Sequence, residues 1–258
     1  MIKQSEPVKL FWTGGWDSTF RFIQLLLIHK MVVQPYYIID PGRNSTLIEI
    51  RTMTAIKKAL IEKSPDLNHL ILPTIFKELN QIEECRQIAE SYKRLTMVEN
   101  IGIQYEWLAR FCDDEGINDI EISNETAIFD EDNRTRKLLG DDLDRFETGR
   151  GVYYKLNERS KDSDVYKIYG HFIFPVFDYT KKDMVDICKR QDTLDVMKLT
   201  WFCHSPDRNN RPCGKCHPCR TVIREGLGWR LPFVAKLRYY TWPVLRKIAN
   251  SMHLVPKN

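Results

Sequence analysis

Four cysteines in one short segment carry the clearest chemistry in the sequence. They are Cys203, Cys213, Cys216 and Cys219, with the spacing C-x9-C-x2-C-x2-C. Four thiolates satisfy a tetrahedral zinc ion, and a closed set of protein ligands indicates a structural rather than a catalytic zinc. The loop around them is polar, so metal binding would supply its folding free energy. An iron–sulfur cluster is the alternative, and His204 and His217 are spare ligands beside the cysteines.

A second candidate site follows a short apolar run near the N-terminus. The loop consists of Thr13, Gly14, Gly15, Trp16, Asp17 and Ser18. Its glycines let the backbone approach an anion, and the helical pattern that follows places unpaired N–H groups beside it. Thr13 and Ser18 add hydroxyl donors, and Asp17 could hold Mg²⁺ next to bound phosphates. It lacks the lysine of a Walker A loop. The alternative is an ordinary strand-to-helix turn with a capping side chain.

The elements that must position these residues alternate along the chain. The predicted strands are 8–12, 32–39, 70–72 and 119–122, and the predicted helices are 46–63 and 82–115, the latter broken near 98–102. Such alternation predicts an α/β fold with a parallel sheet flanked by helices. Open sheets of this kind bind ligands at the carboxyl ends of their strands, where the glycine loop lies.

Several segments together resemble a known family. Residues 13–18 resemble the pyrophosphate loop of the N-type ATP pyrophosphatases, with threonine in place of the first serine. Thr200-Trp201-Phe202-Cys203 and the run 212–220 are similar to the zinc region of the 7-cyano-7-deazaguanine synthase family. Residues 174–185 resemble its T-K helix start, and residues 39–43 with Glu49 resemble its F-D-Y-G-Q-R-H…E segment. The resemblance implies a Rossmann-like PP-loop domain over 1–195 and a zinc-binding module with a basic aromatic tail over 196–258.

The resemblance also implies a reaction. ATP would adenylylate a deazaguanine carboxylate with loss of pyrophosphate, ammonia would give the amide, and a second activation would give the nitrile. The implied catalytic residues are Asp17, Ser18 and Lys181. The implied nucleotide-binding residues are Thr13, Gly14, Gly15, Trp16, Asp17, Ser18, Thr19 and Asp40. The cofactors would be ATP, Mg²⁺ and Zn²⁺. A solvated lysine is the equal alternative for Lys181, because most lysines are exposed.

The middle of the chain departs from the family. Residues 118–125 and 128–134 do not match the segments that shape the deazapurine site. Two alternatives therefore stay open: transfer of an activated deazapurine acyl group to a protein or modification of tRNA, and a catalytically silent nucleotide-binding interaction protein. Glu121 and Glu125 lie past a predicted strand end and either face the site or, as the preferred interpretation, occupy a solvated loop.

Composition sets the remaining bounds. The 258 residues are 43% hydrophobic and 29% charged, which excludes a disordered, collagen-like or coiled-coil protein. The longest apolar run, 22–28, is too short to cross a bilayer, and no signal-peptide pattern is present, so we expect a cytoplasmic protein with no membrane partner. Cys85, Cys112 and Cys188 are expected as buried apolar side chains.

Two further segments have open roles. Residues 130–167 are highly charged and predict a lid, a recognition insertion or a disordered loop. From residue 220 onward the chain has eight lysines and arginines and one acidic residue, interleaved with aromatic side chains. This tail is expected to pack against the zinc loop or a second subunit of a homodimer, with single-stranded nucleic acid as the alternative partner.

Overall fold

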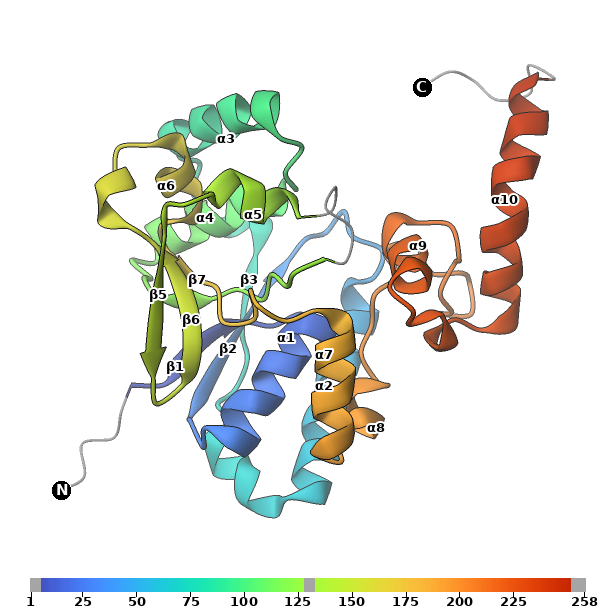
Figure 1. Cartoon of the computed structure of the whole chain (residues 1–258), viewed down its shortest axis with the longest axis horizontal. Helices are drawn as coiled ribbons and strands as arrows, with labels where there is room; N and C mark the ends of the chain where they lie inside the picture. The colour runs from blue at the N-terminus through green and yellow to red at the C-terminus, as the bar shows by residue number, and fades with distance from the viewer. Residues whose placement is uncertain (1–5, 128–132, 252–258) are drawn as a thin grey trace.

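A parallel sheet forms the centre of the molecule (Figure 1). The structure is a computed structural model that describes the backbone of residues 6–127 and 133–251, and side chains as far as residue 242. The described strands of this sheet have the order β3-β2-β1-β4-β7, and every pairing is parallel. They are β1 (Val8–Phe11), β2 (Val33–Ile39), β3 (Ile75–Glu78), β4 (Ile120–Glu121) and β7 (Phe172–Ile173). The predicted α/β, Rossmann-like class is confirmed.

Helices cover both faces of the sheet, because alternate strand residues point to opposite sides. Leu10 and Trp12 belong to one apolar core and Phe11 to the other. The first core includes α1 (Trp16–Ile23), α2 (Thr46–Lys63), α7 (Lys181–Arg190) and α8 (Leu194–Met197). The second core includes α3 (Arg86–Val98), α4 (Gln104–Asp114) and α6 (Asp164–Tyr169). Cys112 and Cys188 are buried as expected, and Cys85 is half-buried.

One predicted strand is wrong. Leu70 is the last residue of a short 3₁₀ helix, Pro65–Leu70, and Ile71 forms an isolated parallel bridge to Val33. The third strand begins at Ile75 as β3, at the edge of the sheet, where Ile75 and Phe76 are 42% and 46% exposed. The apolar run at 70–72 reflects packing of Leu70 into the core, whereas the edge strand has no buried pattern to reveal it.

The charged region 130–167 is folded over its described part. Residues 133–167 contain α5 (Arg134–Leu139), a β5–β6 hairpin (Leu143–Thr148 and Gly151–Leu156) and the first part of α6. A disordered loop is therefore the wrong prediction for these residues, and a lid or recognition role stays a prediction. Residues 130–132 lie outside the described residues.

The C-terminal part stands beside the sheet and ends in a long helix. It contains α9 (His217–Arg224), a 3₁₀ turn at Gly228–Arg230 and α10 (Phe233–Ser251), which projects away from the α/β body in Figure 1. The domain boundary at 195/196 remains a prediction. Among the described residues, no helix has the length and apolarity needed to span a bilayer.

Candidate nucleotide-binding and metal sites

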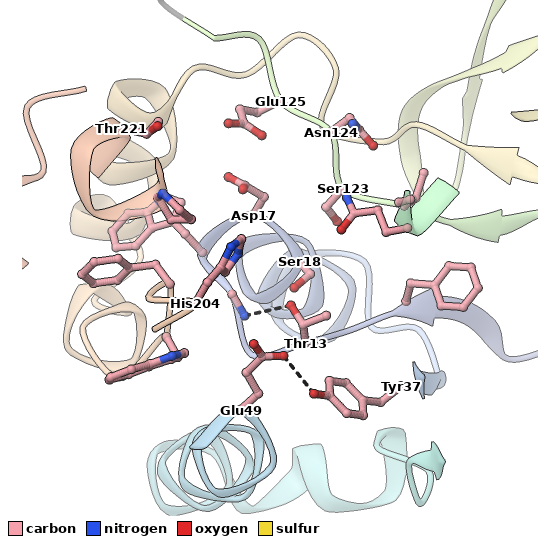
Figure 2. Close-up of a pocket in the computed structure, with 18 of the residues that line it drawn as sticks. Thr13, Asp17, Ser18, Tyr37, Glu49, Ser123, Asn124, Glu125, His204 and Thr221 are labelled. Atoms are coloured by element: carbon pink, nitrogen blue, oxygen red, sulfur yellow. Dashed lines mark hydrogen bonds between the residues drawn. The ribbon is translucent and has the colours of Figure 1, made fainter. Parts of the chain in front are cut away.

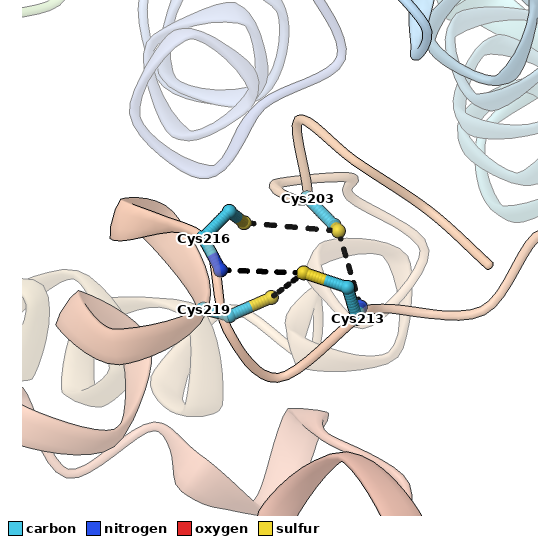
Figure 3. Close-up of side chains that lie close together, drawn as sticks. All are labelled: Cys203, Cys213, Cys216 and Cys219. Atoms are coloured by element: carbon cyan, nitrogen blue, oxygen red, sulfur yellow. Dashed lines mark hydrogen bonds between the residues drawn. The ribbon is translucent and has the colours of Figure 1, made fainter. Parts of the chain in front are cut away.

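The four clustered cysteines converge on one point (Figure 3). The sulfur atoms lie within 4.8 Å of one another, with Cys203 to Cys216 at 3.8 Å and Cys213 to Cys219 at 3.9 Å. A tetrahedron with metal–sulfur bonds of about 2.3 Å has sulfur–sulfur edges of about 3.8 Å. Two of the sulfur–sulfur distances match such an edge, and all four sulfur atoms are close enough to surround one ion, so zinc fits the cluster as the sequence predicts.

Local backbone geometry explains how the cysteines reach this arrangement. The Cys213 sulfur accepts hydrogen bonds from the N–H groups of Lys215 and Cys216, both at 3.3 Å. Gly214 permits this tight turn because it has φ +75°, in the left-handed region. A Cβ on Gly214 would lie 2.1 Å from the carbonyl oxygen of Ala235. The first turn of α10 therefore packs directly on the metal loop.

A cavity of about 530 Å³ opens between this module and the carboxyl edge of the sheet (Figure 2). Residues after β1, β2 and β4 form one side, α4 forms another, and the C-terminal module closes the third. His204 and His217 line this cavity and do not belong to the sulfur cluster. His204 and His217 therefore lie at the cavity rather than at the metal site.

The glycine loop contributes most of its predicted residues to the cavity. Those that line it are Thr13, Gly15, Trp16, Asp17 and Ser18. The backbone N–H of Gly15 donates to Thr13 Oγ1 at 3.3 Å, which fixes the turn into α1. The first turn of α1 thus borders the cavity.

Three predicted nucleotide-binding residues do not line the cavity. Gly14 packs against α2, and its carbonyl oxygen accepts a hydrogen bond from the Trp201 N–H. The Thr19 hydroxyl is buried and accepts a hydrogen bond from the indole of Trp12. Asp40 Oδ1 accepts the Gly42 N–H at 2.8 Å within its own turn. These residues shape the loops, and the structure does not place their side chains at the cavity.

Two polar atoms of the loop are buried without a hydrogen-bond partner in the described part of the chain. They are Ser18 Oγ and Trp16 Nε1, on residues only 8% and 3% exposed. Buried polar groups are nearly always hydrogen-bonded, so unpartnered ones beside a cavity point to a ligand. Both atoms can donate, which suits an anionic ligand.

Lys181 is a buried cation at the centre of the polar side of the cavity. It is 7% exposed, so the alternative of a solvated lysine is wrong. Its ammonium group contacts Asp17 and lies 2.8 Å from Glu125. Burial alone lowers the pKa of Lys181, but the charges of Asp17 and Glu125 outweigh burial and hold this pKa above its usual range. Lys181 is therefore charged at any physiological pH.

The two carboxylates beside Lys181 differ in their titration. Burial and the nearby charge of Glu125 raise the pKa of Asp17 to about 6, although Lys181 acts in the opposite direction. Burial alone raises the pKa of Glu125, but Lys181 outweighs it and holds this pKa below the ordinary value. Two carboxylates that share one ammonium group leave excess negative charge, which favours binding of a further cation.

Neighbouring elements hold this cluster in place. Thr180 caps α7, and its hydroxyl accepts the Asp183 N–H at 3.2 Å, so Lys181 enters the cavity at the start of the helix. Arg21 of α1 makes a two-pronged contact with Glu121 of β4, at 2.7 and 2.8 Å, with both side chains buried. This pair ties the glycine-loop helix to the strand that leads to Glu125. The preferred prediction of a solvated loop is wrong for both glutamates.

A second hydrogen-bonded group closes the cavity on the α2 side. Glu49 accepts hydrogen bonds from Tyr37 at 2.9 Å and Ser45 at 2.6 Å, and Arg43 lies 3.4 Å from it. Burial and the charge of Glu49 raise the pKa of Tyr37 well above its usual range. The network fixes the side chains at the carboxyl end of β2.

Glu225 and Arg230 line the cavity and are not among the site residues that the sequence predicts. Glu125 also lines the cavity, which is the less favoured of the two positions that the sequence leaves open for it. The sequence favours a solvated loop for Glu125 because carboxylates are usually exposed. Glu225 and Arg230 follow the cysteines in the basic C-terminal segment. The compact fold of the metal loop brings this segment back to the sheet, and that fold is the one signal that could have indicated their position.

Comparison with known proteins gives a family match for the C-terminal part of the candidate sites. Residues 158–227 match the family model described as queuosine biosynthesis protein QueC. The match covers α7, the cysteine cluster and α9, and confirms the resemblance to the 7-cyano-7-deazaguanine synthase family over this segment. It supports a queuosine-pathway enzyme of the pyrophosphate-loop type. The loop at 13–18 lies outside the matched residues. No curated protein and no solved structure matches the chain.

Proposed function

We propose that the chain is an ATP-dependent ligase that activates a carboxylate by adenylylation, releases pyrophosphate and passes the acyl group to nitrogen. One observation carries the proposal. The unpartnered donors of Trp16 and Ser18 share a cavity with the cluster of Asp17, Lys181 and Glu125. Such a cavity offers hydrogen-bond donors to phosphate oxygens and carboxylates to a divalent cation.

The nucleotide phosphates suit the first turn of α1. Anions bind well at helix N-termini because the unpaired N–H groups and the helix dipole both favour negative charge. Ser18 Oγ and Trp16 Nε1 are the side-chain donors that such an anion would satisfy. Lys181 adds a positive charge that its own partners keep fully protonated.

Asp17 and Glu125 would hold Mg²⁺. Mg²⁺ prefers oxygen ligands and often takes one or two carboxylates together with substrate phosphates. When bound, Mg²⁺ would neutralise charge on the leaving pyrophosphate. The protein residues would keep the reacting groups aligned, which lowers the barrier by orientation and by electrostatic stabilisation.

The chemistry balances in two steps. A carboxylate oxygen of the acid attacks the α-phosphorus of ATP, the bond to the β-phosphate oxygen breaks, and pyrophosphate leaves with the electron pair. A nitrogen nucleophile then attacks the acyl carbon, AMP leaves and the nitrogen loses a proton. With ammonia the product is a primary amide. A second adenylylation of the amide oxygen, followed by loss of AMP and protons, would give a nitrile.

Aromatic lining supports a planar acid such as 7-carboxy-7-deazaguanine. Tyr36 and Trp107 lie on the sheet and α4 side of the cavity, and Trp201 and Phe202 lie on the metal-module side. A volume of about 530 Å³ is within the range of small-ligand sites. The choice of a deazaguanine rests on the family match at residues 158–227.

A macromolecular acceptor is the second candidate, and α10 favours it. Phe233 and Tyr240 are 78% and 67% exposed on this helix, and Lys236 and Arg238 lie between them. An exposed aromatic and basic helix suits contact with a tRNA or a protein that supplies the amine in place of ammonia.

The test is release of AMP and pyrophosphate from Mg-ATP with 7-carboxy-7-deazaguanine, with ammonium, tRNA or neither. The proposal expects acid-dependent AMP and pyrophosphate in equal amounts, and the mass of the product identifies the acceptor. Formation of ADP and phosphate, or no acid-dependent release of AMP with any acceptor, would overturn it.

A further inference from the structure

Arg230 brings a cation into the cavity from the C-terminal module, in addition to Lys181 and Arg43. It is the last residue of the 3₁₀ turn Gly228–Arg230 and lines the cavity. Its guanidinium carbon lies 4.7 Å from the ring centre of Trp16 and 4.6 Å from that of Phe202. Trp16 is the first residue of α1, so the guanidinium lies at the helix start that borders the proposed phosphate site.

The hydrogen bonds of Arg230 leave much of its donor capacity unused. Nη2 donates to the carbonyl oxygen of Thr200 at 2.8 Å and to Thr200 Oγ1 at 2.6 Å. A guanidinium has five N–H groups in a planar fork. Within the described residues, Nε and Nη1 have no acceptor. One edge of the fork therefore anchors the side chain, while another remains available to a ligand.

The surroundings keep Arg230 charged in a place that suits an anion. Burial lowers its pKa to about 10, and the charges of Asp17 and Glu225 act against that shift. Its neighbour Trp16 has a buried indole N–H without a partner among the described residues. An arginine with free donors beside another unpartnered donor has the chemistry of a planar oxyanion site.

We propose that Arg230 binds an oxyanion of the reacting ligands, either a phosphate of the nucleotide or the carboxylate of the acid. The inference rests on the proposed function and adds to it. The C-terminal module closes the cavity and also supplies a positive charge, which the α/β domain does not provide at this position. Thr200, Trp16 and Phe202 act as positioning residues because they hold the guanidinium fork in one orientation.

The test compares binding of two anions to the full-length protein by isothermal titration calorimetry. Inorganic pyrophosphate with Mg²⁺ probes the phosphate source, and 7-carboxy-7-deazaguanine probes the carboxylate source. Arg230→Gln should weaken one of them roughly 10- to 100-fold, the effect of losing a charged hydrogen-bonded partner. Arg230→Lys should recover part of the affinity. Arg238→Gln, a matched loss of charge on α10 outside the cavity, should leave both affinities unchanged.

A second measurement remains informative if the Arg230 variants fold poorly. Metal content and thermal unfolding show whether a variant keeps its zinc module. In the unaltered protein, phenylglyoxal labelling read by mass spectrometry should modify Arg230, and the bound anion should protect it. Equal affinity of Arg230→Gln and the unaltered protein for both anions, or labelling of Arg230 that neither anion reduces, overturns the inference. If the unaltered protein binds neither anion, the proposed function fails instead.

Discussion

At the scale of single residues, the site depends on three charges that share one small volume. Lys181 is held between Asp17 and Glu125 and stays protonated, while burial and Glu125 make the second carboxylate, Asp17, hard to ionise. Unfavourable ionisation of this kind is typical of functional sites, because residues that suit ligand binding lower the stability of the ligand-free protein. The cluster therefore predicts opposite effects of one substitution on stability and on activity.

Asp17→Asn should stabilise the ligand-free protein and abolish turnover. The folded-state pKa of Asp17, about 6, is above the ordinary value of 3.8, so the stability that the neutral carboxyl allows below pH 3.8 is lost as the pH rises from 3.8 to about 6. Asparagine resembles the neutral form, so the free energy of unfolding at pH 8 should rise by about 1–3 kcal/mol. Urea unfolding at pH 8 and at pH 5 measures this. A gain that does not shrink at pH 5 would contradict the assignment.

Gly214→Ala tests the contact between the metal loop and α10. A Cβ at this position meets the Ala235 carbonyl and also strains a backbone at φ +75°. Gly226→Ala is the matched control, because Gly226 has φ +76° and no atom within 4 Å of the added Cβ. We expect a loss of about 1 kcal/mol for the control, from backbone strain, and a clearly larger loss with weaker zinc retention for Gly214→Ala. Equal losses would mean that α10 does not rest on the loop.

At the scale of elements, a buried ion pair aligns the two halves of the site. Arg21 and Glu121 join α1 to β4 and are 2% and 0% exposed, so either charge left alone would be costly. Glu121→Gln should destabilise the protein by about 3 kcal/mol and slow turnover, because α1 and the segment that holds Glu125 lose their common anchor.

The exposed pair of Lys58 and Glu62 provides the control for this prediction. Its side chains are 75% and 65% exposed, so Glu62→Gln should change stability by less than about 1 kcal/mol. Chemical unfolding of both variants gives the comparison. If the two substitutions cost the same, the buried pair does not stabilise the arrangement as described.

The sequence predicted the elements that have strong local patterns and missed those that depend on distant partners. The glycine loop, the helix at 46–63 and the four cysteines have signals within a few residues, and the structure contains each. Glu125 is half-buried beside Lys181, which comes from a helix 56 residues later in the chain. Arg230 likewise reaches the cavity through the fold of the metal module. No local spacing reveals such contacts, because burial of a single charge is set by tertiary packing.

At the scale of the whole molecule, the cavity exists only where the two parts of the chain meet. The α/β part supplies Asp17, Ser18 and Lys181, and the C-terminal part supplies His204 and Arg230. A site divided in this way makes ligand binding depend on the fold of the cysteine module.

Loss of the metal should therefore remove binding while the sheet remains folded. Cys216→Ser should lower the zinc content from one ion per chain, expose residues 200–235 to hydrogen exchange and abolish pyrophosphate binding. Strands β1 and β2 should keep their protection. Cys85→Ser, a cysteine outside the cluster, should leave all three properties unchanged. Full pyrophosphate affinity in a zinc-free Cys216→Ser protein would show that the module is not part of the site.

The central claim is that a carboxylate attacks the α-phosphorus of ATP, and transfer of an isotope tests it most directly. The acid, 7-carboxy-7-deazaguanine labelled with ¹⁸O in its carboxylate, is incubated with Mg-ATP and an amine acceptor, and the AMP is analysed by mass spectrometry. The account predicts that the first activation transfers a single ¹⁸O atom from the acid to the phosphate of AMP. AMP that forms without ¹⁸O, or label found in inorganic phosphate with ADP as the nucleotide product, would contradict it.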